Sequence, residues 1–205
     1  MTRKRGRKTL AVSVVNPAPG NLRIVQELLN TADYRRKAEG LESPRALAGW
    51  LVARDLLPAG TDLADEDLRR AIDVREGLRA LTAANNGRPL DASAVERLGR
   101  ALGAASFRLV FDSEGRGSFV PASRSCEDAL GHIAGIVAAA QLEGTWPRLK
   151  ACANDACRGV FYDLSKSQSG KWCSMRRCGN QLKSLAYRKR QPPMPPPWKS
   201  WIKDS

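Results

Sequence analysis

Apolar residues recur every three or four positions over much of residues 22–143, with polar residues between them. This spacing places apolar side chains on one face of a helix. Ser43, which is followed by Pro44, and Asp91 are residue types that favour the start of a helix. We therefore expect five helices, at 22–30, 43–57, from 62 or 65 to 84, 91–104, and from 123 or 125 to 143.

The spacing changes between residues 107 and 120. Phe107, Leu109 and Phe111 alternate with other residues, residues 112–117 are turn formers, and residues 118–120 return to an extended pattern. Alternation with a period of two around a turn predicts a β-hairpin. Because the chain shows no βαβ alternation and no internal repeat, we predict an α+β fold with an α-rich N-terminal domain that contains this hairpin.

Four of the five cysteines form two Cys-x4-Cys pairs, Cys152 with Cys157 and Cys173 with Cys178, separated by fifteen residues. Two close pairs joined by a spacer of hairpin length can supply four thiolates to one tetrahedral zinc ion. The alternatives are two disulfides or four unrelated buried thiols, and the repeated spacing in a polar segment favours the metal. The sequence therefore predicts one structural zinc ion bound by these four cysteines.

The spacer between the two pairs predicts a small zinc-finger fold. Residues 159–162 have the pattern of a strand, residues 163–170 are turn formers, and residues 171–173 return as a second strand. A helix then begins near Ser174, a good N-cap, and continues to about Arg190, before the prolines. A hairpin followed by a helix with the last ligand in its first turn is the order of a treble-clef-like four-cysteine finger.

The helix predicted after Ser174 has two different faces at about 100° per residue. One face, which we expect to hold the zinc ion and the core, carries Met175, Cys178, Leu182, Leu185 and Ala186. The opposite face offers donors and acceptors suited to base edges in a DNA major groove, and it carries Arg176, Arg177, Asn180, Gln181, Ser184, Tyr187 and Arg188. Phosphate contacts at the flanks are expected from Lys183, Lys189, Arg190, Lys166 and Lys171.

The net charge of +13 is unevenly distributed. Residues 1–8 carry five Lys or Arg and no acid, residues 148–205 have a net charge of +10, and residues 9–147 have a net charge of −2. A basic field confined to one small module indicates a polyanion partner, whereas charge that serves only solubility would be more evenly spread. We expect DNA rather than RNA, because Phe161, Tyr162 and Trp172 alone could stack on bases and the hairpin core needs at least two of them.

Several runs of residues resemble a known family. Those around the cysteines, which are similar to the CGNR zinc finger, are Leu149–Cys157, Phe161–Ser167 and Trp172–Asn180. Those upstream, which resemble the ABATE domain that accompanies this finger, are Leu29–Thr31, Ala48–Leu51 and Val74–Arg79. Gln181 stands where the family has Arg, so it keeps hydrogen-bonding capacity without the charge. The resemblance implies a bacterial, cytoplasmic transcription regulator.

The motifs of common enzyme classes are missing, so we do not expect catalysis. The single histidine, His132, has no partner nearby in the sequence, and four thiolates leave a zinc ion no open coordination position. Cys126 is expected to be structural rather than a redox sensor, because only Arg124 is available to lower its pKa. The Arg75–Arg79 segment could bind an anionic effector, but its Glu76 could equally pair with an arginine one turn away.

We divide the chain into a basic arm with a short apolar segment at 1–20, an N-terminal domain at 21–147, the finger at 148–190 and a Pro/Trp-rich tail at 191–205. The N-terminal domain is expected to fold without the metal, because it has apolar helix faces of its own. The sequence leaves open whether this domain binds a small-molecule effector or forms a homodimer, and whether the finger binds RNA or another protein instead of DNA. Without a membrane-spanning apolar run or a signal peptide, we expect a cytoplasmic protein with no membrane partner.

Overall fold

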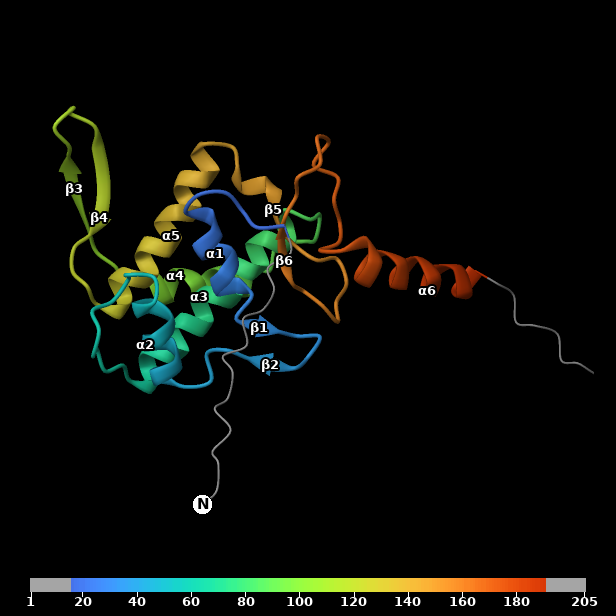
Figure 1. Ribbon diagram of the computed structural model, residues 1–205, viewed down its shortest axis with the longest axis horizontal. Helices are drawn as coiled ribbons and strands as arrows, with labels where there is room; N and C mark the ends of the chain where they lie inside the picture. Colours follow the sequence, from blue (N-terminus) through green and yellow to red (C-terminus); the bar gives the residue numbers. More distant parts are fainter. Residues whose placement is uncertain (1–15, 191–205) are drawn as a thin grey trace, which may run out of the picture.

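Five helices form the body of the molecule in the computed structural model, which describes residues 16–190 (Figure 1). The helices are α1 (Leu22–Leu29), α2 (Pro44–Val52), α3 (Asp65–Ala84), α4 (Ala92–Leu102) and α5 (Cys126–Leu142). The long helix α3 is central and contacts the other four. All five predicted helices and the α+β class are confirmed, although the second helix ends at Val52 rather than at 57. Residues 1–15, with the basic arm and most of the short apolar segment, and the tail at 191–205 lie outside the described residues.

Side-chain caps fix where several helices begin. Ser43 Oγ accepts a hydrogen bond from the Ala46 amide at 3.2 Å, and Pro44 occupies the first turn of α2. Asp91 caps α4 in the same way, through the Ala94 amide at 3.1 Å. A side-chain oxygen at this position satisfies an amide that has no partner inside the helix.

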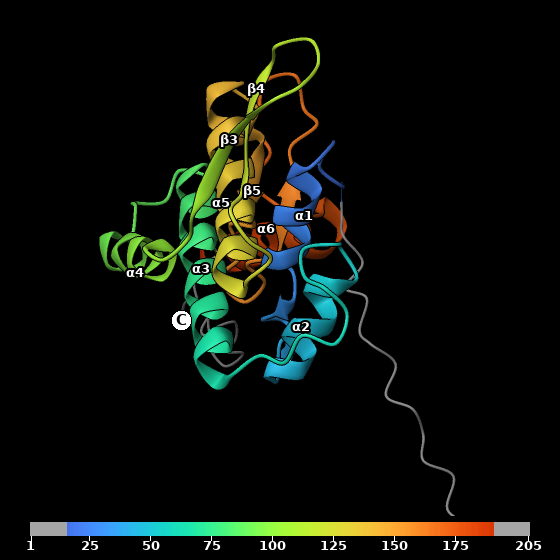
Figure 2. The ribbon, with the colours of Figure 1, turned by 90° about the vertical axis from the view of Figure 1, so that its left-hand side faces the viewer.

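Two hairpins lie outside the helical body. Strands β3 (Phe107–Phe111) and β4 (Gly117–Pro121) form the predicted one, which extends beyond α5 in both views (Figures 1 and 2). Strands β1 (Ala32–Asp33) and β2 (Ala38–Glu39) form a second, which the sequence did not predict because two-residue strands are too short to show alternation.

The hairpin of the finger is formed by β5 (Leu149–Ala151) and β6 (Val160–Tyr162). Our prediction that residues 171–173 would be the second strand is wrong, because that segment is not a strand and β6 pairs instead with β5. The physical reason is the burial of apolar side chains. Leu149 and Ala151 of β5 are buried beside β6, whereas Lys171, at the start of residues 171–173, is exposed.

Each face of the β5–β6 hairpin serves a different core. One face joins the large helical core through Leu149, Ala151, Val160 and Tyr162. On the other face Phe161 packs with the four cysteines, as the two-residue period of a strand requires. The finger is therefore built onto α1 and α3.

The last helix, α6 (Asn180–Arg190), extends away from the body after a π-helical turn, η2 (Met175–Gly179) (Figure 1). The predicted cap is confirmed, since Ser174 Oγ accepts a hydrogen bond from the Arg177 amide at 3.3 Å. The prediction that Leu185 and Ala186 face the core is wrong: α6 has no buried residue, and Leu185 is 42% exposed. A π-helical turn contains an extra residue, so it rotates the following residues away from a uniform 100° pattern, and the helix packs mainly against η2.

Candidate metal centre

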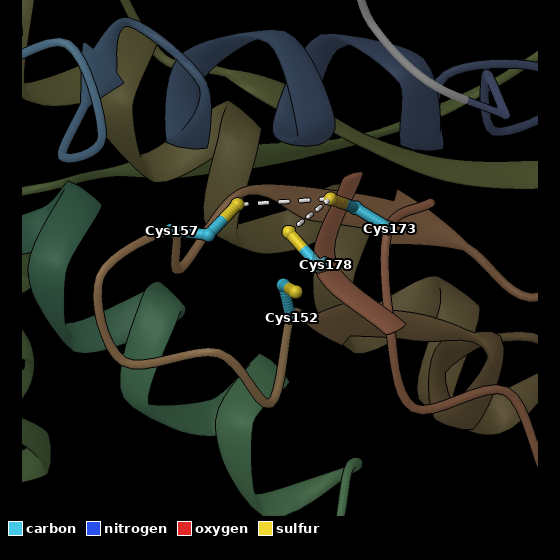
Figure 3. Close-up of side chains that lie close together, drawn as sticks. All are labelled: Cys152, Cys157, Cys173 and Cys178. Atoms are coloured by element: carbon cyan, nitrogen blue, oxygen red, sulfur yellow. Dashed lines mark hydrogen bonds between the residues drawn. The ribbon is translucent and has the colours of Figure 1, made fainter. Parts of the chain in front are cut away.

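The four cysteines of the two pairs converge at the junction between the β5–β6 hairpin and η2. Cys152 follows β5 directly, Cys157 precedes β6, Cys173 precedes the Ser174 cap, and Cys178 lies within η2. Their sulfur atoms all lie within 4.8 Å of one another and point toward a common centre (Figure 3). Three of these side chains are buried and Cys157 is half-buried.

The sulfur positions fit a tetrahedral zinc site. Four sulfurs at about 2.3 Å from one ion would lie roughly 3.8 Å from each other. The Cys157 and Cys173 sulfurs are 3.6 Å apart, and the Cys173 and Cys178 sulfurs are 3.8 Å apart. The chain therefore has a four-cysteine site for one structural zinc ion, whose closed ligand set would hold the hairpin and η2 together.

Backbone hydrogen bonds shape the loop that carries the first pair. The Cys157 and Arg158 amides both donate to the Asn154 carbonyl, at 2.8 and 3.0 Å. The Asn154 side chain is buried and accepts from the Ala156 amide at 3.1 Å. Arg158 then adopts a φ of +48°, which turns the chain back into β6. The loop is a compact knuckle that sets the spacing between Cys152 and Cys157.

The thiols influence one another strongly. Hydrogen bonding to Cys157 raises the pKa of the Cys152 thiol to about 12, and the same contact lowers the pKa of Cys157. Four thiolates at this spacing would repel one another, so a divalent cation is the natural charge partner of the cluster. Arg35 adds a positive charge beside it, with its guanidinium 3.9 Å from the Cys178 sulfur.

A cleft of about 410 Å³ opens beside the cluster, between the β1–β2 hairpin and the finger. Arg35, Arg36 and Arg177 line it, together with Asp33 and three of the four cysteines. Arg36 is paired with Asp33 at 3.6 Å, so part of this positive charge is already neutralised. The thiolates of a zinc-loaded site would neutralise more of this positive charge. We therefore interpret the arginines of the cleft as charge partners of the metal-bound thiolates rather than as a binding site for an anion.

Side-chain amides connect the finger to the helical body. Asn30, which caps the C-terminal end of α1, donates to the Val160 carbonyl and accepts from the Val160 amide, both at 2.8 Å. Asn85 and Asn86, which follow α3, donate to the Leu149 and Ala151 carbonyls at 2.9 and 2.7 Å. These amides satisfy the free edges of a two-stranded sheet, which would otherwise leave buried polar groups without partners.

The sequence analysis did not predict that side-chain amides would connect the finger to the helical body. The available signal was the position of Gln26 and Asn30, which are polar residues four apart on the apolar face of α1. Buried amides at such positions need specific partners, and Gln26 also donates to the Val160 carbonyl, at 3.2 Å.

The Arg75–Arg79 segment is structural. Arg75 is buried and forms two hydrogen bonds with the Glu39 carboxylate, at 2.7 and 2.8 Å. Arg79 is also buried; it binds Glu76 at 2.9 Å and donates to the Arg158 carbonyl in the knuckle at 3.1 Å. The network holds β2 and the knuckle against α3.

The remaining singled-out residues show no catalytic arrangement within residues 16–190. Cys126 is buried at the start of α5, and burial raises the pKa of its thiol to about 12, which makes it unreactive. His132 is half-buried on the same helix. It lines a second cleft, of about 450 Å³, with Arg108 and Arg124, and none of the four metal-site cysteines lines this cleft.

All the residues predicted to contact nucleic acid are exposed. On η2 and α6 they are Arg176, Arg177, Asn180, Gln181, Lys183, Ser184, Arg188, Lys189 and Arg190. Lys166 and Lys171 lie in the loop that follows β6. Buried Lys150 stabilises this loop: it forms an ion pair with Asp163 at 2.8 Å and donates to the Gln168 carbonyl.

Comparison with protein-family models identifies the two parts of the chain. The model described as the CGNR zinc finger matches residues 148–191. The model named ABATE, described as "Putative stress-induced transcription regulator", matches residues 22–156, about two thirds of the chain. The chain belongs to the ABATE family. The ABATE match overlaps the CGNR match and includes Cys152, which agrees with the way the β5–β6 hairpin packs in both cores.

Both matched families are regulatory or zinc-finger types rather than known enzymes. No curated protein matches this ABATE chain. Among the helices of residues 16–190, none is long and apolar enough to cross a membrane.

Proposed function

We propose that this ABATE protein is a cytoplasmic transcription regulator that binds duplex DNA through η2 and α6. The observation that carries the proposal is the exposure of a basic helix: within residues 16–190, none of the eleven residues of α6 is buried. The zinc site would fix the start of this helix, because Cys178 is a ligand within η2. A helix that is held at its first turn and exposed along the rest of its length can enter a DNA groove.

The charge of this region supports a polyanion partner. Residues 164–190 contain eight Lys or Arg and no Asp or Glu. None of these eight cations has a carboxylate within its own segment, so they are available to phosphates. At 1.5 Å per residue, α6 is about 16 Å long, which suits a major groove about 12 Å wide.

We assign the contacts by side-chain chemistry. Base edges would be read by Arg176, Arg177, Asn180, Gln181, Ser184 and Arg188, whose donors and acceptors match the groove pattern. Phosphates would be bound by Lys183, Lys189, Arg190, Lys166 and Lys171, which position the helix without reading sequence. In this account residues 21–147 form the domain that senses an effector or dimerises, and residues 148–190 form the reader.

One observation favours a second candidate, a protein-interaction module. The same helical segment exposes apolar side chains, with Met175 at 47%, Leu185 at 42% and Tyr187 at 65% exposure. A partner protein could cover these residues. RNA is the weaker third candidate, because Phe161 and Tyr162 are buried and Trp172 is half-buried, so none of these three rings is fully exposed for stacking on bases.

A salt series of binding titrations tests the proposal. Fluorescence anisotropy would compare duplex DNA, duplex RNA and single-stranded RNA of equal length, with zinc-loaded protein. We expect duplex DNA to bind most tightly, with a log-affinity against log-salt slope of about −4 to −7, as contacts to about five to eight phosphates would give. Absence of duplex DNA binding at low salt would overturn the proposal and favour the protein-interaction module.

A further inference from the structure

The β3–β4 hairpin presents an apolar face to solvent. Leu109 pairs directly with Phe119, and Phe107 and Phe111 lie two residues either side of Leu109, so all four side chains lie on one face. Their exposed fractions are 42% for Phe107, 54% for Leu109, 68% for Phe111 and 72% for Phe119. Along β3 the exposure increases from Phe107 at the base of the hairpin to Phe111 at its outer part, which extends beyond the helices in Figures 1 and 2.

Within residues 16–190, only the base of this face is covered by other parts of the chain. The Phe107 ring lies over two glycines of α5, because a Cβ built on Gly131 would be 3.3 Å from its Cζ and one on Gly135 would be 3.7 Å from its Cε1. Phe111 extends across to Gly117 on the opposite strand. Leu109, Phe111 and Phe119 are left exposed by the described part of the chain.

The size of this face is that of an interface. With about 200 Å² for a fully exposed aromatic or leucine side chain, the four residues expose roughly 500 Å². That lies in the upper part of the range of about 300–600 Å² for the largest apolar patch on a typical monomer, a patch that often has a function. Two such faces together would bury about 1,000 Å², which is the lower bound for a specific protein interface.

A partner would also stabilise the β3–β4 hairpin. Two strands alone are marginally stable in water, and each edge of β3–β4 leaves backbone groups unpaired. At the turn Arg116 pairs with Asp112 at 3.0 Å and with Glu114 at 2.8 Å, so the tip has little charge to repel another copy. The face itself carries no charge to attract a nucleic acid.

We propose that the apolar face of the β3–β4 hairpin is a homodimer interface, covered by the same face of a second copy of this chain. A two-fold contact places identical patches together and would cover Leu109, Phe111 and Phe119 of both copies at once. In Figure 1 the hairpin and α6 lie at opposite ends of the molecule, so such a dimer would leave both α6 helices accessible. The inference does not depend on what α6 binds.

Sedimentation velocity over a concentration series, with the full zinc-loaded chain, tests this interface. We expect the wild-type chain to dimerise. We expect the double variant Phe111→Ser/Phe119→Ser to raise the dimer Kd at least about 100-fold, because each copy loses two aromatic anchors. The matched control is Leu164→Ser, which removes an equally exposed apolar side chain, 67% exposed, from the finger and should leave the dimer intact.

Circular dichroism and zinc content would verify that each variant is folded. If the double variant fails to fold, Phe119→Glu replaces it, since one carboxylate from each copy would meet at the two-fold axis and give the same loss. A wild-type chain that stays monomeric overturns the proposal, as does a dimer that persists in the hairpin variants or is lost in Leu164→Ser. A chain ending at Arg190 that dimerises when the full chain does not would also overturn it, because the tail would then be the occupant.

Discussion

Replacing Asn30 with alanine tests how firmly the finger is attached to the helical body. The Asn30 side chain forms two buried hydrogen bonds with the backbone of Val160, both of 2.8 Å. The variant would leave the Val160 amide without a partner, whereas the Val160 carbonyl would keep its bond from Gln26. An orphaned buried donor costs about 1–3 kcal/mol, and the lost packing adds to it, so we expect about 3 kcal/mol of destabilisation.

Urea unfolding of the zinc-loaded protein would measure this difference. A loss of about 3 kcal/mol would lower the Tm of a chain of this size by roughly 6–12 °C. Zinc should also leave faster to a coloured chelator, because Val160 lies three residues after Cys157. The control is Asn21→Ala at the other end of α1, where the asparagine is exposed and caps nothing. Equal unfolding free energies and zinc release in the two variants would refute the reasoning.

Three further predictions concern the metal, a buried ion pair and the fifth cysteine. Pure protein should contain one zinc ion and Cys173→Ser none. Chelation should remove only part of the circular dichroism signal, because the helices of residues 21–147 have apolar faces of their own, and complete loss of the helical signal would show that the finger and the helices unfold as one cooperative unit. Lys150→Met should lower the free energy of unfolding, measured in urea at neutral pH, by about 3–5 kcal/mol, because it leaves Asp163 buried without its partner. The control Lys166→Met, at an exposed lysine, should lower it by less than about 0.5 kcal/mol. An equally small effect of Lys150→Met would contradict the buried ion pair. Cys126 should resist a thiol reagent in the native protein and react once unfolded, and rapid native labelling would contradict its burial.

The pH dependence of the Lys150 effect follows from its partner. Burial would raise the pKa of Asp163, but hydrogen bonds from Lys150, Ser165 and the Gly170 amide outweigh it and hold that pKa below its usual range. A carboxyl with a lowered pKa in the folded state stabilises the protein above its unfolded pKa, about 4, and this contribution is lost as the pH falls through the folded value. The difference between wild type and Lys150→Met should therefore shrink below pH 4.

Local patterns in the sequence were enough to predict the helices, the β3–β4 hairpin and the metal site. Helix starts at Ser43 and Asp91 depend on neighbouring residues, and the cysteine spacing restricts the four ligands to one ion. The pairing of β5 with β6 depends on a core that the two strands share with α1 and α3. The sequence around residue 149 does not indicate which helices pack against these strands.

The direction of α6 was also beyond local reasoning. Its apolar residues suggested a buried face, but a π-helical turn precedes the helix and the chain leaves the body there. The Asn30 and Gln26 contacts were hidden for a related reason, since a buried amide is recognised only once its distant backbone partner is known.

The most direct test of the account is the salt dependence of duplex DNA binding by Arg177→Ala/Arg188→Ala, compared with wild type. The matched control is Arg100→Ala/Arg116→Ala, which removes two exposed arginines from α4 and the hairpin turn. With zinc retained, we predict that the finger variant weakens binding and flattens the log-affinity against log-salt slope by about 0.9 per lost phosphate contact, or relaxes sequence preference at a cost of about 1–3 kcal/mol per lost base contact. Affinity, slope and sequence preference equal to those of the wild type and the control would contradict the account.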